Sequence, residues 1–345
     1  MIDAPVASDG LFPLESGDAA CVPTSTHPAF QHILVPLDRS QLAERILPYL
    51  LAVARAGAAR LTLLQVLQEP NARNGSVGVD TVEWEMTRAD GQSYLDAIAT
   101  RLRAHGVDSR IELAQGATAE QIESFATRGD VDLIVMTSHG EGGVSSHWAR
   151  GSTAQKVIAT ATTSILVVPM HANAAASKDE APLRRILLPL DCSRRAECVL
   201  PAATALARIH DAELILAHVV CEPEMPRRMG PSPVDIELAH DVVQRNRHEA
   251  ASYMRELQSR LASECSRIGT RLCIGTNRAQ ALRELIERES IDLVILAAHG
   301  GTGDAQQRYG SLAAEFLQAG YGPLLIVQDL ARLAERHDSN DLPST

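Results

Sequence analysis

Two aspartates stand at matching places in this 345-residue chain, each directly after a short apolar run. Asp38 follows His32-Ile-Leu-Val-Pro-Leu, and Asp191 follows Arg185-Ile-Leu-Leu-Pro-Leu. An aspartate at the turn from a strand into a helix often caps that helix through its carboxylate. The same carboxylate could instead accept a hydrogen bond from an adenine amino group or a ribose hydroxyl. The residues alone leave both roles open.

Two glycine-rich segments suggest a second kind of chemistry. Gly140-Glu-Gly-Gly143 and Gly300-Gly-Thr-Gly303 each follow an apolar run, and they lead to the pairs Gly151-Ser152 and Gly310-Ser311. Glycine lets backbone N–H groups approach an anion closely, and a helix N-terminus adds positive potential. This pattern predicts two phosphate-binding loops, each closing on the start of a helix.

The polar side chains around these Gly-Ser pairs have two readings. Ser152 and Ser311 could contact a phosphate or cap the helices that they open, and Gln155 lies at the capping-box distance from Ser152. Arg150 and Arg308 stand shortly before the two pairs. Either arginine could supply a cation for a phosphate, or remain an ordinary exposed side chain.

Histidines precede both glycine segments, at His139 and His299. Neither has a partner at a recognised metal-ligand spacing, so we predict no metal site and expect each imidazole to anchor its loop by a hydrogen bond. The chain contains no Gly-x-x-x-x-Gly-Lys-[Ser/Thr] phosphate loop, no Gly-x-Gly-x-x-Gly after the first strand and no Gly-x-Ser-x-Gly elbow. These absences disfavour a dedicated NTPase or an α/β-hydrolase, and we assign no catalytic residue.

Composition narrows the class of protein. A net charge of −11 argues against general nucleic-acid binding, which needs a basic face. The six cysteines form no Cys-x-x-Cys pair, which favours reduced thiols in the cytoplasm. The apolar runs are strand-sized, so no membrane span is expected. The first thirty residues carry no Lys or Arg, which argues against a targeting peptide.

The chain repeats a whole domain. Besides the two aspartate runs, Val131-Asp-Leu-Ile-Val-Met-Thr-Ser-His-Gly140 matches Ile291-Asp-Leu-Val-Ile-Leu-Ala-Ala-His-Gly300. A repeat on this length scale indicates two copies of a domain rather than a solenoid. We predict a flexible extension, a first domain, a linker, a second domain and a flexible tail, at residues 1–29, 30–170, 171–183, 184–329 and 330–345.

Strands are expected to alternate with helices in both copies. Such alternation predicts βαβ crossovers and a mainly parallel sheet with helices on both faces. Ligands of these sheets bind beyond the carboxyl ends of the strands, where both aspartates and both histidines should lie. In the first copy we predict strands at 33–37, 61–67, 109–114, 133–136 and 164–168, with helices at 41–55, 80–104 and 118–128 and from 152. In the second we predict strands at 185–190, 213–220, 270–275, 291–296 and 324–328, with helices at 194–209, 233–267, 278–289 and 311–319.

Together these motifs resemble the universal stress protein family. The resemblance rests on the aspartate-ended strand, the Ser-His-Gly loop and the closing Gly-Ser, and it covers residues 30–170 and 184–329. It implies an α/β fold of two tandem Rossmann-like, adenine nucleotide alpha hydrolase-like domains, each with a five-stranded sheet. It also implies that the two last strands pair edge to edge, with residues 165–168 against 325–327, and it leaves a further homodimer of such chains open.

The nucleotide-binding branch of that family carries Gly, two residues, Gly, nine residues and then Gly-[Ser/Thr]. In the second copy the nine-residue spacing fits, but Ala297 replaces the first glycine. In the first copy Thr137 replaces it and the spacing is ten residues. Threonine is stiff and branched where a phosphate would approach, so the second copy is the better candidate site.

The resemblance implies a cytoplasmic stress-response protein that binds ATP or a related adenine nucleotide, with or without magnesium, as a sensor or regulator. Hydrolysis would be slow and incidental at most. The alternative is a nucleotide-independent interaction module, with protein partners and degenerate glycine loops. Neither reading involves nucleic acid or a membrane. The implied nucleotide contacts are Pro36, Asp38, Val66, Gly140, Gly151, Ser152 and Thr153 in the first copy, and Pro189, Asp191, Val219, Gly300, Gly310 and Ser311 in the second.

Overall fold

The computed structural model describes residues 30–57, 59–68, 81–138, 153–169, 183–223, 232–301 and 307–328. The predicted N-terminal extension and C-terminal tail, nearly all of the predicted linker and the first glycine segment lie outside the described residues. The second glycine segment is described as far as Gly301 and again from Gln307.

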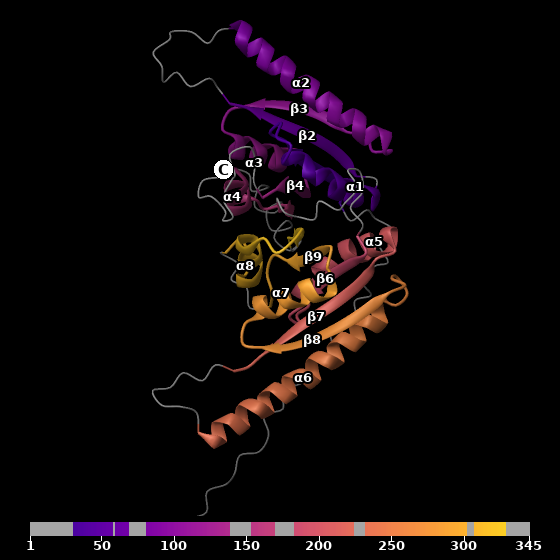
Figure 1. The fold of residues 1–345 in the computed structure, drawn as a ribbon, viewed down its shortest axis with the longest axis vertical. Coiled ribbons are helices and arrows are strands. Elements are labelled where there is room, and N and C mark those ends of the chain that lie inside the picture. Colours follow the sequence, from indigo (N-terminus) through magenta and orange to yellow (C-terminus); the bar gives the residue numbers. More distant parts are fainter. Residues whose placement is uncertain are drawn as a thin grey trace, which may run out of the picture.

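Both domains have the alternating order that the sequence predicts (Figure 1). The first contains β1 (His32–Pro36), η1 (Ala43–Ile46), α1 (Leu47–Arg55), β2 (Arg60–Leu67), α2 (Thr81–Ala104), β3 (Arg110–Gln115), α3 (Thr118–Arg128), β4 (Leu133–Thr137), α4 (Thr153–Thr160) and β5 (Ser164–Val168). The second contains β6 (Arg185–Pro189), η3 (Arg195–Val199), α5 (Leu200–His210), β7 (Glu213–Cys221), α6 (Pro233–Leu261), β8 (Ile268–Gly275), α7 (Arg278–Glu289), β9 (Leu293–Ala297), α8 (Ser311–Ala319) and β10 (Leu324–Val327).

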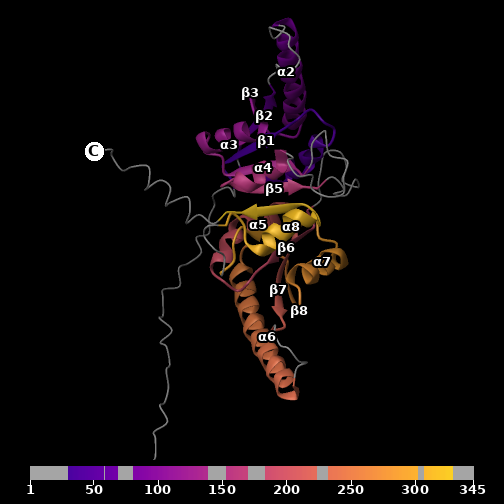
Figure 2. The ribbon, with the colours of Figure 1, turned by 90° about the vertical axis from the view of Figure 1, so that its left-hand side faces the viewer.

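The strands of the described residues form one 10-stranded sheet, in the order β3-β2-β1-β4-β5-β10-β9-β6-β7-β8. Pairing is parallel within each domain and antiparallel only between β5 and β10, where Ile165 lies opposite Ile326 and Leu166 opposite Leu325. The expected edge-to-edge pairing is therefore confirmed, and it joins the two domains at the middle of the molecule (Figure 2). Because each edge covers the other, neither is left open to aggregation.

The core forms two layers, one on each face of the sheet. Buried side chains of α1, α2, α5 and α6 pack together over one face, and those of α3, α4, α7 and α8 over the other. Both layers run through both domains. The parallel strands read as continuous apolar runs because both of their faces are covered.

Two proline residues explain where the first helix of each domain begins. The predicted helices at 41–55 and 194–209 are each split into a short 3₁₀ helix and an α-helix, and Pro48 or Pro201 lies in the first turn of the α-helix. Proline lacks the N–H that a helix interior needs but suits the first turn. The long helix predicted at 233–267 ends at Leu261, since Leu214 already hydrogen-bonds to the carbonyl of Arg267 in the sheet.

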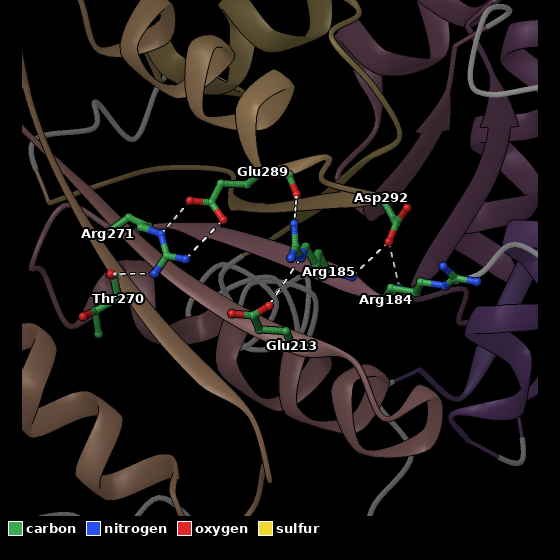
Figure 3. A network of polar contacts seen from close by, with 7 residues as sticks. All are labelled: Arg184, Arg185, Glu213, Thr270, Arg271, Glu289 and Asp292. Atoms are coloured by element: carbon green, nitrogen blue, oxygen red, sulfur yellow. Dashed lines mark hydrogen bonds and ion pairs between the residues drawn. The ribbon is translucent and has the colours of Figure 1, made fainter.

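A polar network fixes the amino-terminal edge of the second domain, opposite the expected ligand edge (Figure 3). Arg185 donates to the carbonyl of Glu289 over 2.6 Å and forms an ion pair with Glu213 at 3.4 Å. The Glu289 carboxylate accepts two hydrogen bonds from Arg271, and these hold the pKa of Glu289 below its usual value. The network ties α7 to three strands.

The aspartate inside the second repeated motif is also structural. Asp292 accepts hydrogen bonds from the backbone N–H groups of Arg184 and Arg185, at 2.7 and 2.9 Å. Asp132 does the same in the first domain for Gln31 and His32. Each aspartate thus joins the start of the first strand to the start of the fourth.

Candidate functional site

A cavity of about 760 Å³ opens at the carboxyl edge of the second domain. This volume lies within the usual range of small-ligand pockets. The ends of β6, β7 and β9 form its floor, and the first turns of α7 and α8 form its walls. Its lining includes the residues predicted for the second site, namely Pro189, Asp191, Val219, Gly300, Gly310 and Ser311.

Asp191 is bonded within the protein through both of its carboxylate oxygens. Oδ1 accepts hydrogen bonds from the backbone N–H and the hydroxyl of Ser193, at 3.0 and 2.5 Å. Oδ2 accepts a hydrogen bond from the backbone N–H of Gly301 at 2.7 Å. Desolvation raises the pKa of Asp191, but these donors outweigh it, so the pKa lies below its usual value. Asp191 therefore stays ionised and holds the glycine loop against the end of β6.

The serines beside the two aspartates hydrogen-bond to the first turns of the 3₁₀ helices. The Ser193 hydroxyl accepts a hydrogen bond from the N–H of Ala196, in the first turn of η3, at 3.2 Å. In the first domain Asp38 orders Ser40, and Ser40 accepts from Ala43 at 3.0 Å. In both Asp-x-Ser turns the aspartate orients a serine, and that serine bonds to the first turn of the following 3₁₀ helix.

Two glycines of the second loop are needed because of this turn. A Cβ on Gly300 would lie 2.2 Å from Oδ2 of Asp191, and a Cβ on Gly301 would lie 3.0 Å from Cβ of Ser193. The first distance is far inside van der Waals contact. The sequence predicted close approach at Gly300, and the structure shows that the approaching group is the protein's own carboxylate.

The N-terminus of α8 lines the cavity, and among the described residues no side chain caps it. Gly310 occupies the N-cap position and forms no side-chain cap hydrogen bond, while Ser311 is the first helical residue. Capping by Ser311, one of the two predicted roles, is therefore wrong. By contrast, Asn277 caps α7 by accepting from the N–H of Gln280 at 2.9 Å. The first N–H groups of a helix without such a cap can bind an anion.

His299 anchors the loop as predicted. Its imidazole is buried, with 1% of its surface exposed, and Nε2 donates to the carbonyl of Gln307 at 2.6 Å. Within the described ranges its Nδ1 has no hydrogen-bond partner. The loop ends are held as well, because Ala298 donates to the carbonyl of Val327 and Gly310 donates to that of Ala298.

Several cavity-lining polar residues were missed by the sequence reasoning, among them Arg278, His218 and Asn246. Arg278, at the start of α7, lines the cavity, whereas the predicted Arg308 is not among the lining residues. His218 of β7 and Asn246 of α6 also line it. A strand histidine and a helix asparagine belong to no repeated motif, so only the alternation of faces along each element could have pointed to them.

An ion pair that occurs in both domains also holds the 3₁₀ helix after the aspartate turn. The Glu197 carboxylate of η3 accepts from Tyr253 at 3.0 Å and pairs with Arg260 at 2.9 Å, both from α6. In the first domain Glu44 pairs with Arg101 of α2 at 2.6 Å. Each ion pair ties the long helix to the 3₁₀ helix that follows the aspartate.

The first-domain site is only partly described. Pro36 and Val66 lie at the ends of β1 and β2, Asp38 lies in the turn after β1, and Thr153 opens α4. The predicted contacts Gly140, Gly151 and Ser152 lie outside the described residues, as do His139 and Arg150. Thr137, which replaces the first glycine of the pattern, is buried at the end of β4.

No metal centre is evident in the described ranges, where no three His, Cys, Asp or Glu side chains cluster suitably. Asp191 beside the cavity already binds Ser193 and Gly301. These residues do not fit a protein-held magnesium site. In the same ranges, no helix combines the length and apolar character needed to cross a bilayer.

The sequence model described as the universal stress protein family matches residues 29–169 and 182–328. Together these two matches cover most of the chain. The chain belongs to the universal stress protein family. Universal stress protein MJ0577 of Methanocaldococcus jannaschii is 23% identical over 154 residues, which span 42% of this chain and 94% of that protein. A second curated relative from the same organism, universal stress protein MJ0531, is 26% identical over 140 residues, 40% of this chain and 82% of that protein.

Solved structures agree at the level of the fold. A universal stress protein from Archaeoglobus fulgidus aligns with a TM-score of 0.59 at 15% identity, covering 86% of this chain and 98% of that chain. PA1789 of Pseudomonas aeruginosa, described as functionally unknown, aligns with a TM-score of 0.60 at 15% identity, covering 90% and 98%. Both alignments span the two domains, so the tandem α/β arrangement predicted from the sequence is confirmed.

Proposed function

We propose that the second domain binds ATP or a related adenine nucleotide at the carboxyl edge of its sheet, and that this universal stress protein acts as a cytoplasmic sensor or regulator. The observation that carries the proposal is the α8 N-terminus, which opens onto the cavity with glycine at its cap. A phosphate group would accept hydrogen bonds from its first N–H groups. Magnesium would then be held by the phosphates rather than by a protein carboxylate cluster.

Arg278 and the end of β7 provide further contacts for the proposed nucleotide. Arg278 lines the cavity and supplies a cation for the phosphates, in the role that sequence reasoning gave to Arg308. The nucleoside would lie over Val219, next to the end of β6. The cavity is large enough for one nucleotide.

Signalling would follow from two states of the glycine loop. In one state Gly301 is bonded to Asp191 at 2.7 Å, and bound nucleotide would favour or replace this contact. A ligand shifts such an equilibrium only by its difference in affinity for the two states. Asp191 is not placed as a general base for hydrolysis, since it is bonded to the protein through both oxygens.

One observation favours a second candidate function, a nucleotide-independent interaction module. Asp191 already accepts three hydrogen bonds from the protein, which leaves little of its capacity for a nucleoside. Ala297 also replaces the first glycine of the family's nucleotide pattern. In this candidate the loop would be a fixed surface for a protein partner, and homodimers would form through surfaces other than β5 and β10.

Mass spectrometry of nucleotide released from the purified full chain, followed by calorimetric titration with ATP and magnesium, separates the two candidates. We expect binding that Gly300→Val abolishes, because the side chain would collide with Asp191. Gly140→Val, the first-domain counterpart, should leave the stronger binding intact. No detectable binding to the wild-type chain at millimolar ATP would remove the nucleotide proposal and favour the interaction module.

A further inference from the structure

His218 directs one ring nitrogen at the protein backbone. It lies in β7 directly before Val219, and its partly buried imidazole lines the cavity. Nδ1 lies 2.7 Å from the carbonyl oxygen of Leu190 and 3.5 Å from Sγ of Cys192. Leu190 is the residue before Asp191, so His218 braces the end of β6 beside the aspartate turn.

This contact fixes the tautomer of the imidazole. A carbonyl oxygen can only accept a hydrogen bond, so Nδ1 must carry the hydrogen that it donates to Leu190. In the neutral ring Nε2 is then an acceptor without a hydrogen. Burial raises the pKa of the Cys192 thiol to about 11, and the charge of Asp191 adds to this, so the thiol stays protonated and does not compete as a charged acceptor.

Asn246 reaches the same cavity from the long helix α6. It lies on the same face of that helix as the buried residues Val243 and Ala250, one turn from each. Unlike them it is exposed, and it lines the cavity. Its carboxamide offers both a donor and an acceptor.

The first domain carries different groups at the corresponding positions. Gln65 stands directly before Val66, as His218 stands before Val219, and its buried side chain lies 3.0 Å from where a Cβ on Gly91 would be. Thr87 corresponds to Asn246 when Tyr94 and Arg101 are aligned with Tyr253 and Arg260. Its hydroxyl bonds back to the carbonyl of Glu83 in its own helix at 2.9 Å. The pair is thus specific to the second domain.

We propose that His218 and Asn246 select the nucleoside part of the ligand in the second domain. Nε2 of His218 accepts a hydrogen bond from a ligand donor, either a ribose hydroxyl or the exocyclic amino group of adenine. Asn246 contacts the same part of the ligand from α6. This inference rests on the proposed nucleotide binding and adds the residues that give it selectivity.

The test is a competition titration of the full chain with four nucleotides: ATP, 2′-deoxy-ATP, 3′-deoxy-ATP and ITP. Each of the last three lacks one of the donors in question. We expect the wild-type chain to bind one of them about tenfold more weakly than ATP, since one hydrogen bond is lost and an acceptor is left unpaired. In His218→Ala the ratio of the dissociation constant of that analogue to the dissociation constant of ATP should fall to near one.

Three further variants test whether the protein stays folded and whether the effect is confined to the second-domain site. His218→Gln introduces the first-domain residue, so it suits the strand, and it should change the ratio without loss of fold. Asn246→Ala should lower the ratio or the overall affinity several-fold. Gln65→Ala, in the first domain, should leave the ratio unchanged.

The outcomes separate the two proposals. If the wild-type chain binds no nucleotide, the proposed function fails and this inference fails with it. If it binds all four nucleotides equally, or if folded His218→Ala and His218→Gln keep the wild-type ratio, nucleotide binding stands and the selective role of His218 is overturned.

Discussion

The backbone N–H of Gly301 donates a hydrogen bond to Oδ2 of Asp191 over 2.7 Å, joining parts of the chain that are 110 residues apart. Asp191 belongs to the turn after the first strand of the second domain, and Gly301 to the loop after the fourth. Because the same carboxylate also orients Ser193, one side chain sets both the start of η3 and the position of the glycine loop.

Asp191→Ala should release this loop. We expect the free energy of unfolding to fall by about 1–2 kcal/mol, because hydrogen bonds to a charged acceptor are lost. The amide of Gly301 should exchange with solvent faster, which native-state hydrogen exchange measures. Asp38→Ala is the matched change in the first domain and should leave exchange at Gly301 unchanged. Unaltered exchange at Gly301 in Asp191→Ala would show that the hydrogen bond does not hold the loop.

The same contact should depend on pH. The pKa of Asp191 is lowered in the folded chain, so its contribution to stability is fully present above the ordinary aspartate pKa of about 3.9. It should be lost as the pH falls from that value through the lower, folded pKa. A titration of the Gly301 amide resonance between pH 6 and pH 2 would follow this loss. A midpoint above the ordinary aspartate value would contradict the account.

Two glycines of the second loop should respond differently to a single added methyl group. Gly300→Ala places a Cβ 2.2 Å from Oδ2 of Asp191, so the carboxylate or the loop must shift, their contact is disturbed, and ATP affinity should fall by tenfold or more. In Gly310→Ala the nearest atom lies 3.6 Å from the new Cβ, an ordinary contact. Its affinity should change only a few-fold. Calorimetric titration of both variants tests the contrast, and equal losses would refute it.

The pairing of β5 with β10 should contribute strongly to the stability of the tandem chain. Leu166 and Leu325 lie opposite each other and are fully buried. Leu166→Ala should therefore lower the free energy of unfolding by about 2–5 kcal/mol. Leu238→Ala, at an exposed site of α6, should change it by less than about 0.5 kcal/mol. Chemical denaturation measures both, and a similar small effect at the two sites would contradict this role for the pairing.

Much of the fold was predictable because it depends on local patterns. The helices predicted at 118–128 and 278–289 appear with those bounds, since an amphipathic pattern and clear ends define them. The pairing of the last strands followed from the family resemblance. The end of α6 was placed too late, because sheet pairing at Arg267 overrides helical propensity beyond Leu261.

The candidate site was less predictable because its key contacts are long-range. The sequence marked Asp191 and Gly300 separately, but it could not show that the carboxylate lies against the glycine. Nor could it show that Ser193, rather than Asp191, bonds to the first turn of η3, since both residue types favour helix starts. His218 and Arg278 were missed because each is an ordinary residue of its own element and gains its place only when β7 and α7 meet at the cavity.

The most direct test of the central claim is hydrogen exchange of the full chain with and without millimolar ATP and magnesium, read by mass spectrometry. We predict slower exchange in residues 296–301 and 310–315 of the second domain, with a weaker effect or none at residues 137–153 of the first. Unchanged exchange in the second-domain segments, or protection confined to the first domain, would contradict a nucleotide site built on Asp191, the glycine loop and the start of α8.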